Sequence, residues 1–393
     1  DASKEESYVT SGTFYLVDAN GKIAKSITID EQAWADAKVP QQGNDGKTTL
    51  QIPVENVTAG TKYSVYFLAN ATSASPLTDV YTSDLANKFA KAYSADNKFA
   101  MFNQNDADVK ANSHTVVFTS DNKDANSAAK VSDIIKIDRL TARIDEPTSE
   151  ATEIKAYAED AKATEAEKKA NEDAIKAVKG VTLTKYAISN VANKTNVMQQ
   201  WTDATTLSIP TGITYFQPTS EFGTKTLLQN YGYFNAVTTD KSQKDYVFEN
   251  NSANAATSIY FEYKVELSDK YKTNADFEDG TFYRYNKVIY SRIQDIIDAY
   301  KDQKAIFDGK DASTVIAELT AAKNDTTDPE AKLDEFRKKY DIEVFNAGKT
   351  YYVQKIQDQY LGVANTIQRN SIYLLNVKNI FNVGAQVPNG GPD

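Results

Sequence analysis

Few residues in this sequence could carry out catalysis. It contains one histidine, His114, and no cysteine among 393 residues. A catalytic histidine needs a nucleophile and an orienting carboxylate, and no G-x-S-x-G segment supplies the nucleophile. We therefore interpret His114, which precedes the strand-like residues 115–119, as a surface or loop-end residue. Two carboxylates could hydrolyse glycosides, but no local motif marks such a pair. We predict no catalytic residue and no enzyme.

The same composition bears on metals and cofactors. One histidine and no thiolate nearly exclude transition-metal sites. Calcium needs only oxygen ligands, and loop carboxylates occur at Asp106, at Asp108 and in residues 121–126. Neither group has the EF-hand spacing, and Lys123 would repel a cation, so we interpret these residues as solvated turn acids. No glycine-rich phosphate-binding loop is present. We predict no metal and no cofactor.

Charge and hydropathy exclude two further classes of partner. The 44 Lys and Arg residues are scattered among 54 Asp and Glu, which gives a net charge of −10. Such a chain cannot neutralise a row of phosphates, so we predict no nucleic-acid partner. No segment approaches the about 20 apolar residues that span a bilayer. A signal peptide is not seen either, so we expect a cytosolic chain or the mature part of an exported precursor.

Short strands with turn signals between them dominate the pattern. Residues 13–17 and 23–29 flank Asn20-Gly21, which predicts a β-hairpin. Residues 62–70, 134–144, 181–188 and 259–267 also have the composition of strands, and in the last of these every odd position is apolar. The 24 tyrosines fit a β-rich surface protein. Aromatic platforms for sugars are the alternative reading of these tyrosines.

Helical patterns interrupt the strands at four places. Two are short, at residues 31–38 and 83–93. Residues 151–179 are rich in Ala, Lys and Glu, which predicts a surface helix or helical hairpin, with a coiled-coil helix as the alternative. Residues 286–340 carry isoleucines at helical spacing (289, 293, 296 and 297), and Pro329 marks the first turn of another helix.

The length and these patterns predict a mainly β protein with two β-sandwich domains. We place the first domain at residues 1–147 and the second at 148–393, with helical insertions near 151–179 and 286–340. The last strands are residues 349–356 and 369–380, where side chains alternate between two faces; in the second, Tyr373, Leu375 and Val377 share one face, and Ile372 and Leu374 take the other. Strands so apolar near a chain end need a partner that covers them.

Four segments, in this order, resemble strands of the shaft fimbrillins of type V pili, the protease-processed fimbriae of certain Gram-negative anaerobes. They are YSVYFLAN (63–70), RLTARI (139–144), YYV (351–353) and RNSIYLLNVKNI (369–380) followed by Gly384. The family shows Arg-Asn, a short apolar strand and a glycine in this same order near its end. In their order and spacing the four segments extend over nearly the whole chain.

The resemblance implies two transthyretin-like β-sandwich domains and a structural role in a cell-surface fimbria that functions in adhesion. In that family the precursor is exported through the outer membrane as a lipoprotein, and an arginine-specific protease removes an N-terminal strand. The groove thus opened, which we expect in the first domain, accepts a donor strand from the next subunit. The implied partners are neighbouring pilus subunits and a host or bacterial surface ligand.

The sequence departs from the family at both ends. It has no cysteine that could be lipidated and begins directly at Asp1, and it ends at residues 389–393, before a further apolar strand. We therefore assign no donor residues and expect this form to be monomeric. We expect residues 369–380 to be an internal strand and residues after Gly384 to be a dispensable tail. The alternatives are a tip or accessory pilus adhesin, indicated by the tyrosines of residues 231–234, and a surface protein that binds or cleaves glycans.

Overall fold

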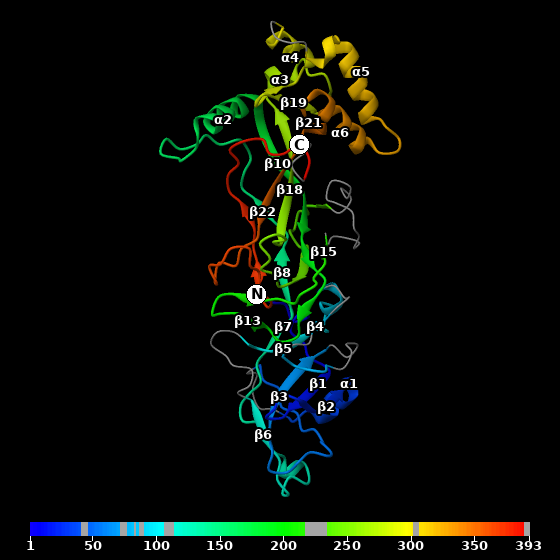
Figure 1. Cartoon of the computed structure of the whole chain (residues 1–393), viewed down its shortest axis with the longest axis vertical. Coiled ribbons are helices and arrows are strands. Elements are labelled where there is room, and N and C mark those ends of the chain that lie inside the picture. The colour runs from blue at the N-terminus through cyan, green and yellow to red at the C-terminus, as the bar shows by residue number, and fades with distance from the viewer. Residues whose placement is uncertain are drawn as a thin grey trace.

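The computed structural model describes residues 1–40, 46–70, 77–81, 84–85, 90–105, 114–216, 234–301 and 306–388. The chain is mainly β, as predicted, and it is elongated. Figure 1 shows an N-terminal sheet at one end, a pair of sheets in the middle, and a group of helices at the other end. Within the described ranges, no helix is both long and apolar enough to cross a bilayer.

The N-terminal sheet is antiparallel, with strand order β2-β1-β3-β5-β7, and β6 also pairs with β3. Its strands are β1 (Gly12–Val17), β2 (Ile23–Ile29), β3 (Lys62–Ala69), β5 (Met101–Asn103), β6 (Thr115–Val117) and β7 (Ile137–Arg139). The predicted hairpin is confirmed: β1 pairs with β2, and Gly21 takes a φ of +79°, which glycine adopts without strain.

The predicted helix at residues 31–38 is also confirmed, as α1 (Glu31–Ala37). It begins after Asp30, whose carboxylate accepts a hydrogen bond from the Ala33 amide at 2.8 Å. Its buried Trp34 packs on one face of the N-terminal sheet, where it stacks on Phe67. The other face packs against residues from the middle of the molecule, including Val197 and Phe248.

The middle of the molecule is a sandwich of two sheets, which we call the central sandwich. Its larger sheet is antiparallel, with order β16-β10-β18-β22: β16 (Asn235–Ala236), β10 (Val178–Ser189), β18 (Ser258–Leu267) and β22 (Lys349–Lys355). The predicted strands at residues 181–188, 259–267 and 349–356 are thereby confirmed.

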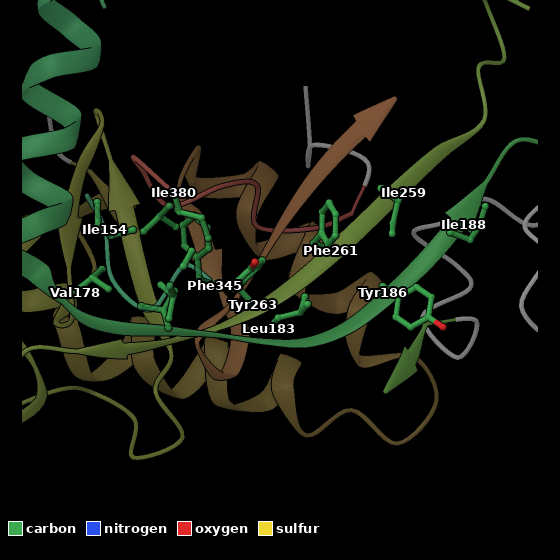
Figure 2. Packing of buried hydrophobic residues seen from close by; sticks show 14 of the residues in the cluster. Ile154, Val178, Leu183, Tyr186, Ile188, Ile259, Phe261, Tyr263, Phe345 and Ile380 are labelled. Atoms are coloured by element: carbon green, nitrogen blue, oxygen red, sulfur yellow. The ribbon is translucent and has the colours of Figure 1, made fainter. Parts of the chain in front are cut away.

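The second layer of the central sandwich combines segments far apart in the sequence. Strands β17 (Lys244–Phe248), β8 (Thr141–Asp145) and β23 (Ile372–Tyr373) form one sheet, and β9 (Thr148–Ser149) and β24 (Asn376–Val377) continue it. Strands β23 and β24 run parallel to β8 and β9. Buried side chains of both layers meet between the sheets, several of them shown in Figure 2, with each fully buried one contributing about 1.5–3 kcal/mol.

Short strand pairs link the sheets. They are β4 (Asp84–Leu85) with β12 (Thr195–Asn196), β11 (Val191–Ala192) with β15 (Tyr215–Phe216), and β13 (Gln200–Trp201) with β14 (Leu207–Ser208). The helix predicted at residues 83–93 is wrong in its described part, which holds β4 and a 3-10 turn. Leu85 pairs with Thr195, and this long-range pairing overrides the local helical pattern.

The predicted helix at residues 151–179 is half right. Only α2 (Glu165–Ala177) is helical, and it begins with a reciprocal capping box between Thr164 and Glu167. Residues 151–163 are not helical: the buried Ile154 forms a parallel bridge with Ile380, and the Lys155 amide donates to the Ile380 carbonyl at 2.8 Å. Pairing with the C-terminal segment therefore decides the conformation of this stretch.

The insertion predicted near residues 286–340 has its own hydrophobic core. This core extends beyond the predicted bounds, from β19 to β21: β19 (Phe282–Tyr285), β20 (Val288–Tyr290), α4 (Ile293–Ala299), α5 (Ala312–Lys323), α6 (Pro329–Tyr340) and β21 (Glu343–Phe345), with α3 (Asp269–Lys272) preceding it. Pro329 opens α6 as predicted, and the Asp328 carboxylate caps it. Ile289 belongs to strand β20 and not to the predicted helix, because the turn at Asn286-Lys287 closes a hairpin there.

The predicted strand at residues 134–144 is divided between two sheets. Its first part is β7 of the N-terminal sheet, and its second part is β8 of the central sandwich, with the buried Leu140 between them. Strand β8 therefore pairs with β17 and β23, although the predicted boundary at residue 147 puts it in the first domain. The two-domain division stays a prediction, and a boundary near residue 140 is our proposal.

Candidate functional site

The residues singled out for chemistry do not come together. His114 is 4% exposed, so its interpretation as a surface residue is wrong: its carbonyl accepts from the Val65 amide, and this holds it against strand β3. Burial lowers the pKa of its imidazole, with Asp133 opposing. Asp124 caps a 3-10 turn, as the solvated-turn interpretation expects. Asp106, Asp108 and Tyr231–Tyr233 lie outside the described residues.

Within the part of the chain that the structure describes, no group of three or more His, Cys, Asp or Glu side chains could hold a metal ion. The buried carboxylates serve structural contacts instead. Glu146, for example, accepts hydrogen bonds from the Thr238 hydroxyl at 2.7 Å and the Gln243 amide at 2.9 Å. We therefore turn from chemistry to the strands that the sequence marks most strongly, those at the C-terminal end.

The Arg369-Asn370 pair fixes where these strands begin. The Arg369 side chain is buried, with its Nη2 atom 2.9 Å from Oε1 of the buried Glu249, and its Nη1 atom donates to the Val197 carbonyl at 2.6 Å. Asn370, at a φ of +58°, accepts from Arg139 at 2.7 Å and donates to Asp138 at 3.0 Å. Arg369 thus anchors the chain in the central sandwich, and Asn370 ties it to strand β7.

Strands β23 and β24 then form one edge of the central sandwich. Amides of residues 143–155 donate to carbonyls along the segment 371–380: Arg143 to Ser371, Thr148 to Leu375, Glu150 to Val377 and Lys155 to Ile380, at 2.8–3.0 Å. Since backbone groups alternate between the two sides of a strand, Ile372, Leu374 and Asn376 direct theirs outward. Among these, Leu374 is 76% exposed. The prediction that this segment pairs within its own chain is confirmed, but it forms two short strands and not one strand over residues 369–380.

Strand β22 is the edge of the facing sheet, and its two halves differ. In the first half Tyr351 exchanges two backbone hydrogen bonds with Ala385, at 2.8 and 2.9 Å. By alternation, Val353 directs its amide and carbonyl toward the same outer side. Among the described residues no partner reaches them, and the Val353 side chain is 55% exposed. The second half of β22 is therefore an open sheet edge.

A groove of about 540 Å³ lies between the two edges. We call it the edge groove. Its lining comes from β18, β22 and the C-terminal segment: Ile259, Phe261, Tyr263, Tyr352, Val353, Gln354, Leu375, Asn376, Val377, Lys378, Asn379, Ile380 and Phe381. Figure 2 shows Ile259, Phe261 and Tyr263 spaced along β18, with Ile380 on the C-terminal segment beyond them. The family resemblance implies such a groove in the first domain, but this one lies in the central sandwich.

Residues after Ile380 close one end of the edge groove. Phe381 stacks on Tyr157, with ring centroids 4.6 Å apart, and the Asn382 carbonyl accepts from the Tyr352 hydroxyl. Arg284 of the helical insertion donates to the carbonyls of Val383 and Gly384, each at 2.9 Å. Through these contacts the chain crosses from the C-terminal edge to strand β22, where Ala385 pairs with Tyr351.

Gly384 is required for this crossing, because a Cβ atom there would lie 2.3 Å from the Tyr351 carbonyl oxygen. Gln386 beyond it accepts from the Val344 amide at 2.7 Å, and Val387 is fully buried. The pairing of Ala385 with β22, the Gln386 bond to Val344 and the burial of Val387 argue against the expectation that residues after Gly384 are a dispensable tail.

The N-terminal segment lies beside the start of β23. Asp1 and Ala2 line a cavity of about 420 Å³ together with Ile372 and Leu374. Glu6 fastens the segment, with its Oε1 atom 2.7 Å from Nη1 of Arg143. Burial opposes the ionised form of Glu6, but hydrogen bonds from Ser3 and the charge of Arg143 outweigh it and lower its pKa.

This arrangement can bind a backbone. An open sheet edge offers unpaired amides and carbonyls to any extended segment that lies alongside it, and side-chain pockets then select the segment. The sequence alone indicated this open edge only in part. Alternation identified strands 349–356 and 369–380, but it could not show that both are edge strands, because an edge is defined by which strands fail to pair with it.

Comparison with known proteins gives distant likenesses. No protein-family model matches the chain, and no curated protein matches it. A fimbrilin (FimA) from Porphyromonas gingivalis W83 is 11% identical, with 98% of this chain and 86% of that chain covered and a TM-score of 0.43. A fimbrial assembly protein from Parabacteroides distasonis ATCC 8503 is 14% identical, with 68% and 80% covered and a TM-score of 0.35.

A provisionally described cell adhesion protein from Bacteroides eggerthii DSM 20697 is 9% identical, with 68% of this chain and 73% of that chain covered and a TM-score of 0.38. With TM-scores below 0.5, these likenesses do not by themselves assign a fold or a function to the chain.

Proposed function

We propose that this protein is a structural subunit of a cell-surface fimbria and that the edge groove receives an extended segment of a neighbouring subunit. The observation that carries the proposal is the open half of β22 beside an apolar groove. Motifs 63–70, 139–144, 351–353 and 369–384, which resemble those of shaft fimbrillins, agree with it. On the basis of that resemblance, the proposal also includes export through the outer membrane, a lipid-anchored precursor and a role in adhesion.

The physics of the groove favours strand addition. An exposed strand edge invites pairing with other chains, so proteins cover or charge such edges unless they use them. A segment that inserts about three apolar side chains would gain roughly 5–9 kcal/mol before the costs of ordering and association. A head-to-tail contact of this kind does not close on itself, and it therefore builds filaments.

The N-terminal segment fits the same scheme. Asp1 lies beside Ile372 and Leu374, at the β23 end of the C-terminal edge. A segment preceding Asp1 in a precursor could reach the edge groove from there. Its removal by a protease would then leave the groove open for a neighbour, as the family resemblance implies.

The proposal is tested by assembly of a longer, protease-trimmed form of the chain that carries a donor strand. We expect heat-resistant ladders on a denaturing gel and filaments by electron microscopy. Val353→Pro should weaken the ladders strongly, because proline removes the outward amide and edge strands tolerate it. Val353→Thr keeps that amide and serves as the matched control. Monomers alone from the trimmed parent, or equal ladders from Val353→Pro and Val353→Thr, would contradict the proposal.

A further inference from the structure

We infer that the edge groove selects an extended segment with apolar side chains at alternate positions and acidic residues at its ends. The inference rests on the proposed function, because it names the chemistry of the segment that the groove receives. Three features of the groove lead to it: its apolar floor, the backbone groups of Val353, and the charges carried by the two edge strands.

The floor of the edge groove is the part formed by Ile259, Phe261, Tyr263 and Tyr352. It offers ring and aliphatic surface but no partner for a buried charge. The Tyr263 hydroxyl is 2.6 Å from the Ser149 hydroxyl, and the Tyr352 hydroxyl already donates to the Asn382 carbonyl. Both hydroxyls are thus occupied within the protein. A charged side chain pushed onto this floor would lose its hydration without compensation, so the side chains that point inward must be apolar.

The backbone groups of Val353 set the spacing of those side chains. A segment that pairs with this edge must be extended, and in an extended segment side chains alternate between the two faces. Every second residue then points to Phe261 and Tyr352 on the floor, and the residues between them point outward. The groove should therefore favour segments in which apolar and polar positions alternate.

The charges at the edges oppose the charge of the whole chain. The chain carries −10 overall, yet Lys378 lines the edge groove and Lys355, the last residue of β22, directly follows the lining residue Gln354. Both lysines are exposed, and neither forms an ion pair with a carboxylate of the described residues. Lysine on an edge strand repels a basic strand and attracts an acidic one. The segment that fits best therefore carries acidic residues near its ends.

Synthetic peptides test this selection on the full chain. Three peptides share one alternating core of valine, isoleucine and threonine and differ only in their flanks, which are Glu, Gln or Lys. Binding is measured by fluorescence anisotropy at low and high salt. We expect the Glu-flanked peptide to bind about three- to tenfold more tightly than the Lys-flanked one, since exposed ion pairs are worth little each. High salt should narrow this difference.

Charge reversal of the edges provides the matched variant. In Lys355→Glu/Lys378→Glu both substitutions are on exposed side chains, so the fold is kept, and the order of the three peptides should reverse. Equal binding of the three peptides to the parent, or an unchanged order in the variant, would overturn the charge selection while leaving the proposed function standing. Failure of all three peptides to bind, the Gln-flanked one included, would overturn both.

Discussion

The two halves of strand β22 form one continuous backbone but have different surroundings. The first half is covered: Tyr351 pairs with Ala385, Gly384 lets the chains approach, and Val387, two residues after Ala385, is fully buried. The second half has no such cover, and Val353 is exposed at the edge groove. Covering an edge thus requires backbone pairing, a small residue at the crossing and a buried side chain together. The open half lacks all three, so we interpret it as a binding site.

The largest expected effect comes from removing the anchor of the opposite edge. Arg369→Met leaves Glu249 buried without its partner, and breaking a buried pair in this way costs about 3–5 kcal/mol. Urea unfolding measures the loss. Lys378→Met, at an exposed position of the same C-terminal segment, is the control and should change the free energy of unfolding by less than about 0.5 kcal/mol. Equal effects of the two substitutions would show that Arg369 does not hold this edge.

A larger residue at Gly384 should disrupt the pairing of Ala385 with the first half of β22. In Gly384→Val the added carbons meet the Tyr351 carbonyl and the Tyr352 ring, and we expect a loss of about 2–3 kcal/mol in the free energy of unfolding. Gly180→Ala is the control, because its Cβ would lie 3.4 Å from the nearest atom, which is at the limit of ordinary contact. If Gly384→Val matched this control, the tail would not be packed against β22 in solution.

Strand β17, in the layer that carries the C-terminal edge, should respond to pH. Burial raises the pKa of Asp245 to about 6 from an ordinary value of 3.8. The folded state then holds its proton more tightly than the unfolded state, so the free energy of unfolding should fall as pH rises from about 4 to about 6. Asp245→Asn removes the titrating group. We expect it to flatten this slope and to stabilise the protein at pH 7 by about 2 kcal/mol.

Thermal or urea unfolding of both proteins at several pH values measures the difference. Glu150→Gln, at an exposed carboxylate directly after strand β9 of the same layer, is the control and should keep the parent slope. A parallel pH dependence of Asp245→Asn and the parent would contradict this account of the layer.

The smallest effect on stability is expected at the open half. Val353→Lys replaces an exposed side chain that pairs with nothing beyond its own sheet, so the free energy of unfolding should change by less than about 0.5 kcal/mol. Binding of the Gln-flanked peptide should nevertheless fall, because the lysine adds charge beside the edge groove. A destabilised variant, or a stable variant with undiminished peptide binding, would show that this half is not an open binding edge.

Local signals predicted the elements that depend on their own sequence. The alternation of residues 259–267, the turn at Asn20-Gly21 and the proline at 329 each specify a local geometry, and the structure has each of them. Residues 151–164 were misjudged as helix because Ile154 pairs with Ile380, more than 200 residues away in the sequence. His114 was misjudged as exposed because its burial depends on strand β3.

The candidate site was the hardest part to predict. Its two edges come from strands that alternation had identified, yet their openness depends on where the chain crosses at Gly384 and on where it does not pair. The glycine itself was a signal, since the resemblance placed it at the end of the last strand. Its role in closing the groove required the distance to Tyr351.

Hydrogen exchange at two backbone amides of β22 tests the central claim most directly. In the chain alone, we expect the Tyr351 amide to exchange slowly, because it donates to Ala385, and the Val353 amide to exchange rapidly. Saturation with the Glu-flanked peptide should slow Val353 and leave Tyr351 unchanged. A slow Val353 amide in the chain alone, or a Val353 amide that stays fast when peptide is bound, would contradict the account.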